Sequence, residues 1–86
     1  MIMEQYFTKD ESINLLGQPV RYKATKYLEV EGQRYPMIEA GAPGEVFSIV
    51  NLPEGIKIGV FVDEDIEELS KDQFNHFCEV IHASPC

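Results

Sequence analysis

Long apolar runs are missing from this sequence, and cysteine is scarce. No apolar stretch approaches the ~20 residues that a membrane-spanning helix requires. The first residues, Met1 to Tyr6, have neither the basic region nor the long apolar region of a secretory signal. The two cysteines, Cys78 and Cys86, both come late, which is not the framework of a disulfide-stapled secreted domain. We therefore expect reduced thiols, a cytoplasmic location and no membrane partner.

Basic residues are also few, and this bears on nucleic-acid binding. Seven lysines and arginines stand against 15 aspartates and glutamates, so the formal net charge at pH 7 is −8. Proteins that bind DNA or RNA neutralise phosphates with clustered Lys and Arg. We therefore predict no direct nucleic-acid binding. The charge is uneven, because residues 18–36 are mildly basic whereas residues 63–79 hold seven acids and a single lysine.

No catalytic or phosphate-binding motif occurs at the spacing that its chemistry requires. The closely spaced acids of residues 63–68 could indicate acid–base chemistry or a hard cation site, because carboxylate oxygens suit Ca²⁺ and Mg²⁺. They lack the alternating acids, central glycine and terminal glutamate of a calcium loop, and we interpret them as a solvated loop. We predict that the protein is not an enzyme and needs no cofactor.

A zinc site is the strongest metal hypothesis. Cys78, His82 and Cys86 follow one another at intervals of four residues, and thiolate and imidazole ligands at that spacing could bind Zn²⁺. Only three ligands are offered, and Cys78 shares an apolar stripe with Phe74 and Ile81. A reduced cysteine in such a stripe commonly behaves as a small hydrophobe. We therefore predict a core cysteine and no metal site, with zinc as the alternative.

The composition that remains is that of one folded domain over residues 1–86. Hydrophobic residues make up 44% and charged residues 26%, which is close to the average of folded globular domains. Within this domain we expect residues 1–7 and 83–86 to be loose. An apolar run at 46–50 is followed by a Pro-Glu-Gly turn and by β-branched residues that alternate from Ile56 to Val62. Because alternation at period two suits a half-buried strand, we predict two paired strands at 45–51 and 56–62.

Two capping patterns predict short helices. Thr8 precedes Glu11 by three residues and Gly17 follows, which favours a helix over Lys9–Leu16. Ser70 precedes Gln73 in the same way. Apolar residues then recur at helical spacing, namely Phe74, Phe77, Cys78 and Ile81. This pattern predicts an amphipathic helix over Lys71–Ile81.

Between the first helix and residue 40 the pattern predicts a hairpin with a kink near Thr25. Apolar residues alternate with polar ones on both sides of a Glu31-Gly32 turn, namely Val20, Tyr22, Ala24, Leu28, Val30, Tyr35 and Met37. Pro36 cannot donate to a strand ladder, so its strand should lie at an edge or break there. Later in the chain, residues 66–69 form either one more short strand or an extended linker.

Three segments together resemble the core of SH3-like small barrels: Gly41-Ala42-Pro43-Gly44-Glu45-Val46-Phe47-Ser48-Ile49, Ile58-Gly59-Val60-Phe61-Val62-Asp63 and Leu69-Ser70-Lys71-Asp72-Gln73-Phe74. The resemblance covers about half of the chain. It implies that the strand with Gly59 bends sharply to close the sheet. We expect a mainly β (α+β) fold, either a small SH3-like antiparallel barrel or an open curled sheet. A short N-terminal helix and a C-terminal amphipathic helix complete it.

Aromatic and acidic side chains are the candidate contact residues. SH3-like peptide binders present aromatics to extended ligands, which would make a contact face of Tyr22, Tyr27 and Tyr35. The simpler interpretation packs one or two of these rings in the core, with their hydroxyls reaching water. An acidic strip offers a second surface, formed by Asp63, Glu64, Asp65, Glu67 and Glu68.

From these surfaces we predict a non-catalytic protein-interaction module, or an accessory subunit of a larger complex, that binds a protein partner. The alternative is an acidic inhibitor or nucleic-acid mimic that occupies a basic groove of a partner enzyme.

Overall fold

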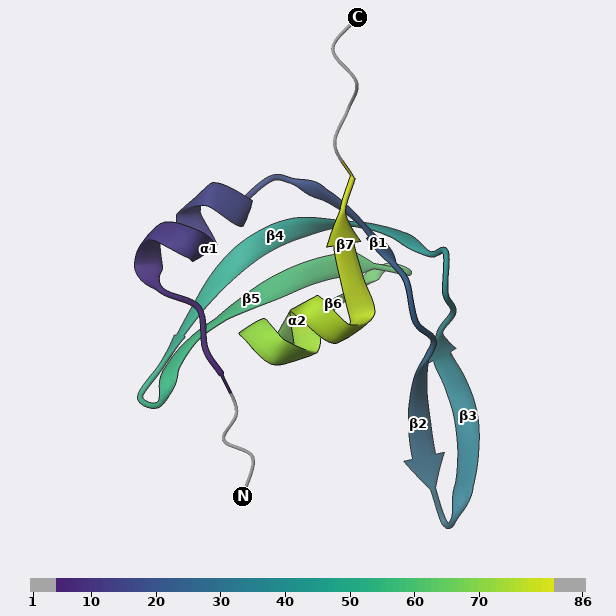
Figure 1. Cartoon of the computed structure of the whole chain (residues 1–86). Helices are drawn as coiled ribbons and strands as arrows, with labels where there is room; N and C mark the ends of the chain where they lie inside the picture. Colours follow the sequence, from purple (N-terminus) through teal and green to yellow (C-terminus); the bar gives the residue numbers. More distant parts are fainter. Residues whose placement is uncertain (1–4, 82–86) are drawn as a thin grey trace, which may run out of the picture.

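Five antiparallel strands form one curved sheet, and a separate two-stranded hairpin extends from it (Figure 1). The computed structural model describes residues 5–81. In chain order its elements are α1 (Lys9–Leu15), β1 (Pro19–Tyr22), β2 (Lys26–Val30), β3 (Gln33–Ile38), β4 (Pro43–Leu52), β5 (Gly55–Val62), β6 (Asp65–Leu69), α2 (Lys71–Phe77) and β7 (Cys78–Val80). The fold is thus mainly β, with two short helices. Neither helix within the described range is long and apolar enough to cross a membrane.

The strand order of the larger sheet is β6-β5-β4-β1-β7, so within residues 5–81 β6 and β7 are its edges and the sheet does not close. Of the two expected architectures, the open antiparallel sheet is confirmed and the closed barrel is wrong. The strands predicted at 45–51 and 56–62 are confirmed as β4 and β5, which pair directly from Gly44 with Val62 to Leu52 with Gly55. Residues 65–69 form a short strand, β6, and not a linker.

Gly59 has a different role from barrel closure. The β4–β5 register shifts between Val46 and Ser48, which leaves Phe47 as the extra residue of a bulge opposite Gly59. A Cβ atom at Gly59 would overlap the Ser48 hydroxyl and would lie 3.1 Å from Cγ2 of Ile66. The glycine therefore makes room for the side chains that crowd this bulge.

The first helix follows from its capping residues as predicted. Thr8 Oγ1 accepts a hydrogen bond from the Glu11 backbone N–H at 3.1 Å, and Glu11 Oε1 accepts one from the Thr8 N–H at 2.9 Å. The helix ends at Leu15, one residue before the predicted end, and Gly17 follows with φ of 84°. Gly17 N–H then donates to the Val46 carbonyl at 2.8 Å, which joins the end of the helix to β4.

The second helix is shorter than predicted. Gln73 Oε1 accepts from the Ser70 N–H at 3.0 Å, so the predicted start is confirmed, but the helix ends at Phe77 instead of Ile81. Residues 78–80 form β7, which pairs with β1 from Tyr22–Cys78 to Val20–Val80. The physical reason is that β1 offers an open edge, and pairing with it satisfies backbone groups that a longer helix would satisfy internally.

The predicted first hairpin is divided between two sheets. β1 lies inside the five-stranded sheet between β4 and β7, whereas β2 pairs with β3 alone within residues 5–81. The expected kink near Thr25 is thus the crossing from one sheet to the other. The Glu31-Gly32 turn is confirmed, with φ of 51° and 79°, the positive values of a type I′ turn. Pro36 lies in an edge strand, as expected.

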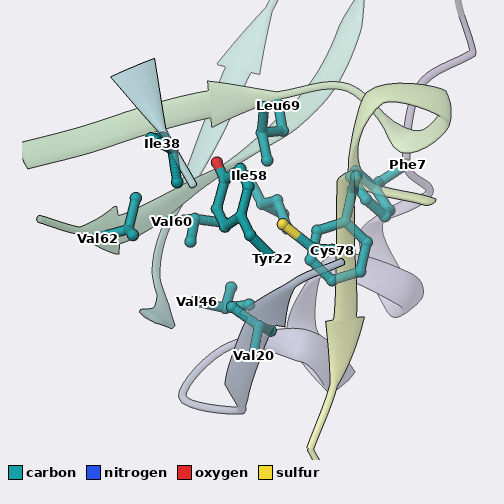
Figure 2. Close-up of a cluster of buried hydrophobic side chains, with 11 residues drawn as sticks. Phe7, Val20, Tyr22, Ile38, Val46, Ile58, Val60, Val62, Leu69 and Cys78 are labelled. Carbon is teal, nitrogen blue, oxygen red and sulfur yellow. The ribbon is translucent and has the colours of Figure 1, made fainter. Parts of the chain in front are cut away.

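One buried cluster joins the elements of the larger sheet (Figure 2). Its members come from β1, β4, β5, β6 and β7, from α2, from the end of β3 and from the chain before α1. They are Phe7, Val20, Tyr22, Ile38, Val46, Ile58, Val60, Val62, Leu69, Phe74 and Cys78. The Phe7 and Phe74 rings meet edge to face, with centroids 5.9 Å apart, and so join the N-terminal segment to α2.

We expect Gly59→Ala to lower the free energy of unfolding by about 1–3 kcal/mol, because the new methyl group overpacks the bulge. Adding Ser48→Ala should restore part of the loss, since the Ser48 Cβ would lie 3.6 Å from the new methyl, an ordinary contact. Urea unfolding of both single variants and the double variant measures this coupling. A Gly59→Ala protein as stable as the wild type would contradict the crowding, as would a double variant with no recovery.

Candidate functional site

The β2–β3 hairpin stands away from the larger sheet (Figure 1). It carries many exposed apolar side chains. Five of them are between 42% and 50% exposed: Tyr27, Leu28, Val30, Tyr35 and Met37. A two-stranded hairpin is marginally stable by itself in water. Exposed apolar groups on such an element contribute little to the fold and are available for contact with another molecule.

The hairpin has two distinct faces, because side chains alternate along a strand. The outer face is defined by Leu28, Val30 and Tyr35, with Leu28 directly opposite Tyr35 in the register. The inner face is defined by Tyr27, Glu29 and Arg34. On it the Arg34 guanidinium lies over the Tyr27 ring, 4.3 Å from the centroid, a cation–π contact.

A cleft of about 590 Å³ separates the inner face from α2. Lys26, Tyr27 and Arg34 line it from the hairpin, and Gln73, His76 and Phe77 line it from α2. The His76 and Phe77 rings meet edge to face, with centroids 4.7 Å apart. The cleft therefore combines aromatic surface with cationic groups, in a chain whose net charge is −8.

An ion pair holds the base of the hairpin. Lys26 Nζ donates to Glu67 Oε1 at 3.1 Å, and the two side chains are only 24% and 16% exposed. The same ammonium group lies 5.8 Å from the centroid of the Phe77 ring. These contacts join β2 to β6 and to α2, so they set the position of the hairpin relative to the sheet.

The acidic strip is not one surface. Glu67 turns toward Lys26, whereas Asp63, Glu64, Asp65 and Glu68 are exposed. Side chains alternate along β6, so neighbouring Glu67 and Glu68 lie on opposite faces. Asp63 and Glu64 form the two-residue β5–β6 turn with φ of 51° and 64°, where glycine or asparagine is usual. Three of the exposed acids, Asp63, Glu64 and Asp65, therefore gather at that turn, and Glu68 lies farther along β6.

Tyr22 belongs to the core and not to a contact face. Its side chain is fully buried, and Figure 2 shows the hydroxyl between Ile38 and Leu69. The expectation that one or two of the three rings pack in the core holds for Tyr22, but its hydroxyl does not reach water. The Cys78 thiol interacts with this hydroxyl, which otherwise has no hydrogen-bond partner among residues 5–81. Burial raises the pKa of this hydroxyl well above its usual range.

Cys78 is buried as well, at the first position of β7, and it pairs with Tyr22 across the β1–β7 ladder. Burial raises the pKa of its thiol to about 11, which disfavours the thiolate form that binds metals. Because Cys78 lies in a strand, the helical spacing from which a zinc site was considered is wrong. His82 and Cys86 lie outside the described residues.

One exposed apolar patch has no counterpart in the sequence analysis. Phe47, Phe61 and Ile66 are between 44% and 58% exposed on β4, β5 and β6, and the two phenyl centroids lie 6.2 Å apart. The bulge at Phe47 brings this ring toward Phe61. A bulge depends on pairing between strands, so no local pattern in the sequence signals it.

No family model matches the chain, and the searches of curated proteins and of solved structures found no significant match.

We expect Tyr22→Phe to leave the free energy of unfolding unchanged or to raise it by up to about 1 kcal/mol, because the buried hydroxyl that it removes has no partner among residues 5–81 except the Cys78 thiol. Tyr35→Phe is the matched control, since the exposed Tyr35 hydroxyl donates to Gln33 Oε1 at 2.8 Å. Urea unfolding measures both. A loss of more than about 1 kcal/mol in Tyr22→Phe would show that the hydroxyl is hydrogen-bonded in solution.

Cys78 should react slowly in the folded protein. In a Cys86→Ser background at pH 8, we expect alkylation by iodoacetamide to be at least about tenfold slower than in the urea-unfolded chain, because the thiol is buried and its pKa is raised. The raised pKa also implies a stabilisation that is complete below about pH 8.5, the pKa of an unfolded cysteine. This stabilisation is lost as the pH rises toward about 11.

The difference in unfolding free energy between this protein and its Cys78→Ala variant should therefore shrink across that window. Equal alkylation rates in the folded and unfolded chains would contradict the burial.

Proposed function

We infer that the chain is a non-catalytic protein-binding module, or an accessory subunit of a larger complex, and that it contacts its partner through the β2–β3 hairpin. The observation that carries this inference is the outer face, where Leu28, Val30 and Tyr35 are exposed together on an element that leaves the sheet. Aromatic and apolar side chains at the centre of an interface supply most of its binding energy.

The charge distribution favours the hairpin over the rest of the surface. Residues 26–38 carry two basic and two acidic side chains, so the net charge of −8 lies entirely outside the hairpin. Interface centres are depleted in charged groups, because each buried charge must be stripped of water. None of these four charged side chains belongs to the outer face of Leu28, Val30 and Tyr35, so a partner can cover that face without stripping a charge of water.

The resemblance to SH3-like modules supports the same proposal, because those modules bind extended ligands on aromatic surfaces. Two of the three aromatics that the resemblance brings forward, Tyr27 and Tyr35, are half exposed on the hairpin. In this protein the SH3-like relationship would concern the β4–β5–β6 part of the sheet, without closure into a barrel.

An acidic inhibitor or nucleic-acid mimic is the second candidate. Its support is the group of exposed acids at the β5–β6 turn, namely Asp63, Glu64 and Asp65, with Glu68 on β6. Binding of that kind is electrostatic, so it weakens steeply as salt screens the charges. Contact through the outer face of the hairpin is mostly apolar and should persist in high salt.

Quantitative affinity capture from the native cell tests the two proposals against each other. The baits are the wild type, Leu28→Ser/Tyr35→Ser on the outer face, Phe47→Ser/Phe61→Ser on the exposed sheet patch, and Asp63→Asn/Glu64→Gln at the turn. We expect a partner that is retained in high salt by the wild type, by the Phe47→Ser/Phe61→Ser bait and by the Asp63→Asn/Glu64→Gln bait. The outer-face bait should lose that partner by at least about tenfold, which corresponds to 1.4 kcal/mol.

Circular dichroism and urea unfolding must first show that the four baits are folded. Loss of the partner with the Phe47/Phe61 bait instead would contradict contact through the hairpin. Loss with the turn bait together with steep salt dependence would favour the acidic mimic.

A further inference from the structure

β2 has a free edge that opens onto the cleft beside α2. It pairs with β3 on one side only among the described residues. Val30 and Gln33 flank a two-residue type I′ turn, so their backbone groups form a hydrogen-bonded pair. From there along the ladder, hydrogen-bonded pairs alternate with pairs that are not hydrogen-bonded, and Glu29 and Tyr27 belong to the second kind. The backbone N–H and C=O groups of Tyr27 and Glu29 therefore point away from β3. They are the groups to which another strand would bind.

The cleft beside this edge is suited to a ligand with a negative charge. Arg34 forms no ion pair within residues 5–81, although the chain has 15 acidic residues, and its guanidinium is held over Tyr27. Lys26 and His76 line the same cleft, and the one acid among its lining residues is Glu29. Lys26 is already paired with Glu67, so Arg34 is the cation of this lining that has no ion pair within residues 5–81.

The cleft also has room and apolar surface for a side chain. Its volume of about 590 Å³ lies within the range of ligand-binding sites, roughly 300–1,000 Å³. The rings of Tyr27 and Phe77 bound it from opposite sides, one on the hairpin and one on α2. A neighbouring apolar residue of the same ligand would contact these rings.

We propose that this cleft binds an extended peptide segment of a partner protein, which adds as a strand to the free edge of β2. The backbone of the peptide pairs with Tyr27 and Glu29. A carboxylate side chain accepts hydrogen bonds from Arg34, and an apolar side chain two residues away, on the same face of the peptide, packs between Tyr27 and Phe77. This proposal rests on the proposed function, to which it adds a second contact, on the inner face and free edge of the same hairpin, and the ligand chemistry of that contact.

Charge decides against the other extended ligands. A basic peptide would bring its charge against Arg34 and Lys26 and would be drawn instead to the β5–β6 turn. A nucleic acid would meet a body of net charge −8 with a phosphate on every nucleotide. A peptide with a single carboxylate meets this repulsion once and gains the contact with Arg34.

Selection from a random-sequence peptide library on the full chain tests the proposal. We expect enriched sequences with Asp or Glu two residues from an aromatic or aliphatic residue. The best peptide, followed by fluorescence anisotropy, should bind at least about tenfold more weakly to Arg34→Glu. It should bind Lys9→Glu within about twofold of the wild type, because this matched charge reversal lies on α1, outside the cleft.

Two further readouts separate strand addition from a purely ionic contact. Exchange of the Tyr27 and Glu29 amide hydrogens should slow when the peptide binds, and N-methylation of the peptide at alternate positions should abolish binding. A peptide with Lys in place of its acid should bind Arg34→Glu better than it binds the wild type. No enriched sequence, enriched basic sequences, or binding insensitive to N-methylation or to Arg34→Glu would each overturn the proposal.

A second copy of the chain is an alternative occupant of the same edge. Sedimentation would overturn the proposal if it showed a dimer that is lost in Arg34→Glu and that no selected peptide dissociates. The occupant of the edge would then be a second copy of the chain and not a peptide. Failure here is distinguishable from failure of the proposed function, because the partner-capture variants change the outer face and leave the inner face intact. A partner lost with Leu28→Ser/Tyr35→Ser while no peptide binds would leave the proposed function standing alone.

Discussion

The arrangement of the whole molecule depends on β1, a strand of four residues that is paired on both sides. β4 pairs with one edge of β1 and β7 with the other, and the side chains of Val20 and Tyr22 are fully buried in the hydrophobic cluster. Without β1 the curved sheet would lose its link to β7 and to α2, the helix that directly precedes β7. The strand is short because the chain leaves the sheet directly after Tyr22, and this exit directs the β2–β3 hairpin outward (Figure 1).

Contacts at its base join the projecting hairpin to the rest of the molecule. Ile38, the last residue of β3, reaches the buried cluster, and Lys26 at the start of β2 bonds to Glu67 while its ammonium lies near Phe77. A partly buried ion pair is weak evidence for stability, because desolvation offsets the attraction between the charges. Its consequence here is geometric, since it joins the start of β2 to β6. The cleft lies between this hairpin and α2, which Lys26 contacts through the Phe77 ring.

Elements with local causes could be predicted from the sequence. The capping residues Thr8 and Ser70 locate both helix starts, and the alternation from Ile56 to Val62 locates β5. β7 could not be predicted, because its strand conformation comes from pairing with β1, more than 50 residues earlier in the chain. The helical spacing of Phe74, Phe77 and Cys78 is the same in a helix followed by a strand, so the pattern does not show where the helix ends.

The candidate site illustrates the same division. The aromatic content of the hairpin was visible in the sequence, but the three tyrosines separate only when the sheets are known, since Tyr22 lies in the larger sheet and Tyr27 and Tyr35 in the smaller one. The acids from Asp63 to Glu68 also divide, because one of them turns inward to Lys26. Composition indicates which groups are present, whereas strand pairing decides which of them share a face.

Charge and exposure together explain why one element can serve as a contact surface. The many acidic side chains repel one another, and the same repulsion opposes association of two acidic surfaces. The neutral hairpin carries its apolar groups away from that charge, so a partner can cover Leu28 and Tyr35 without burying carboxylates. Its inner face retains Arg34 as a cation without an acidic partner in the described part of the chain. Exposed apolar side chains and a cation without an ion pair are thereby separated on the two faces of one hairpin.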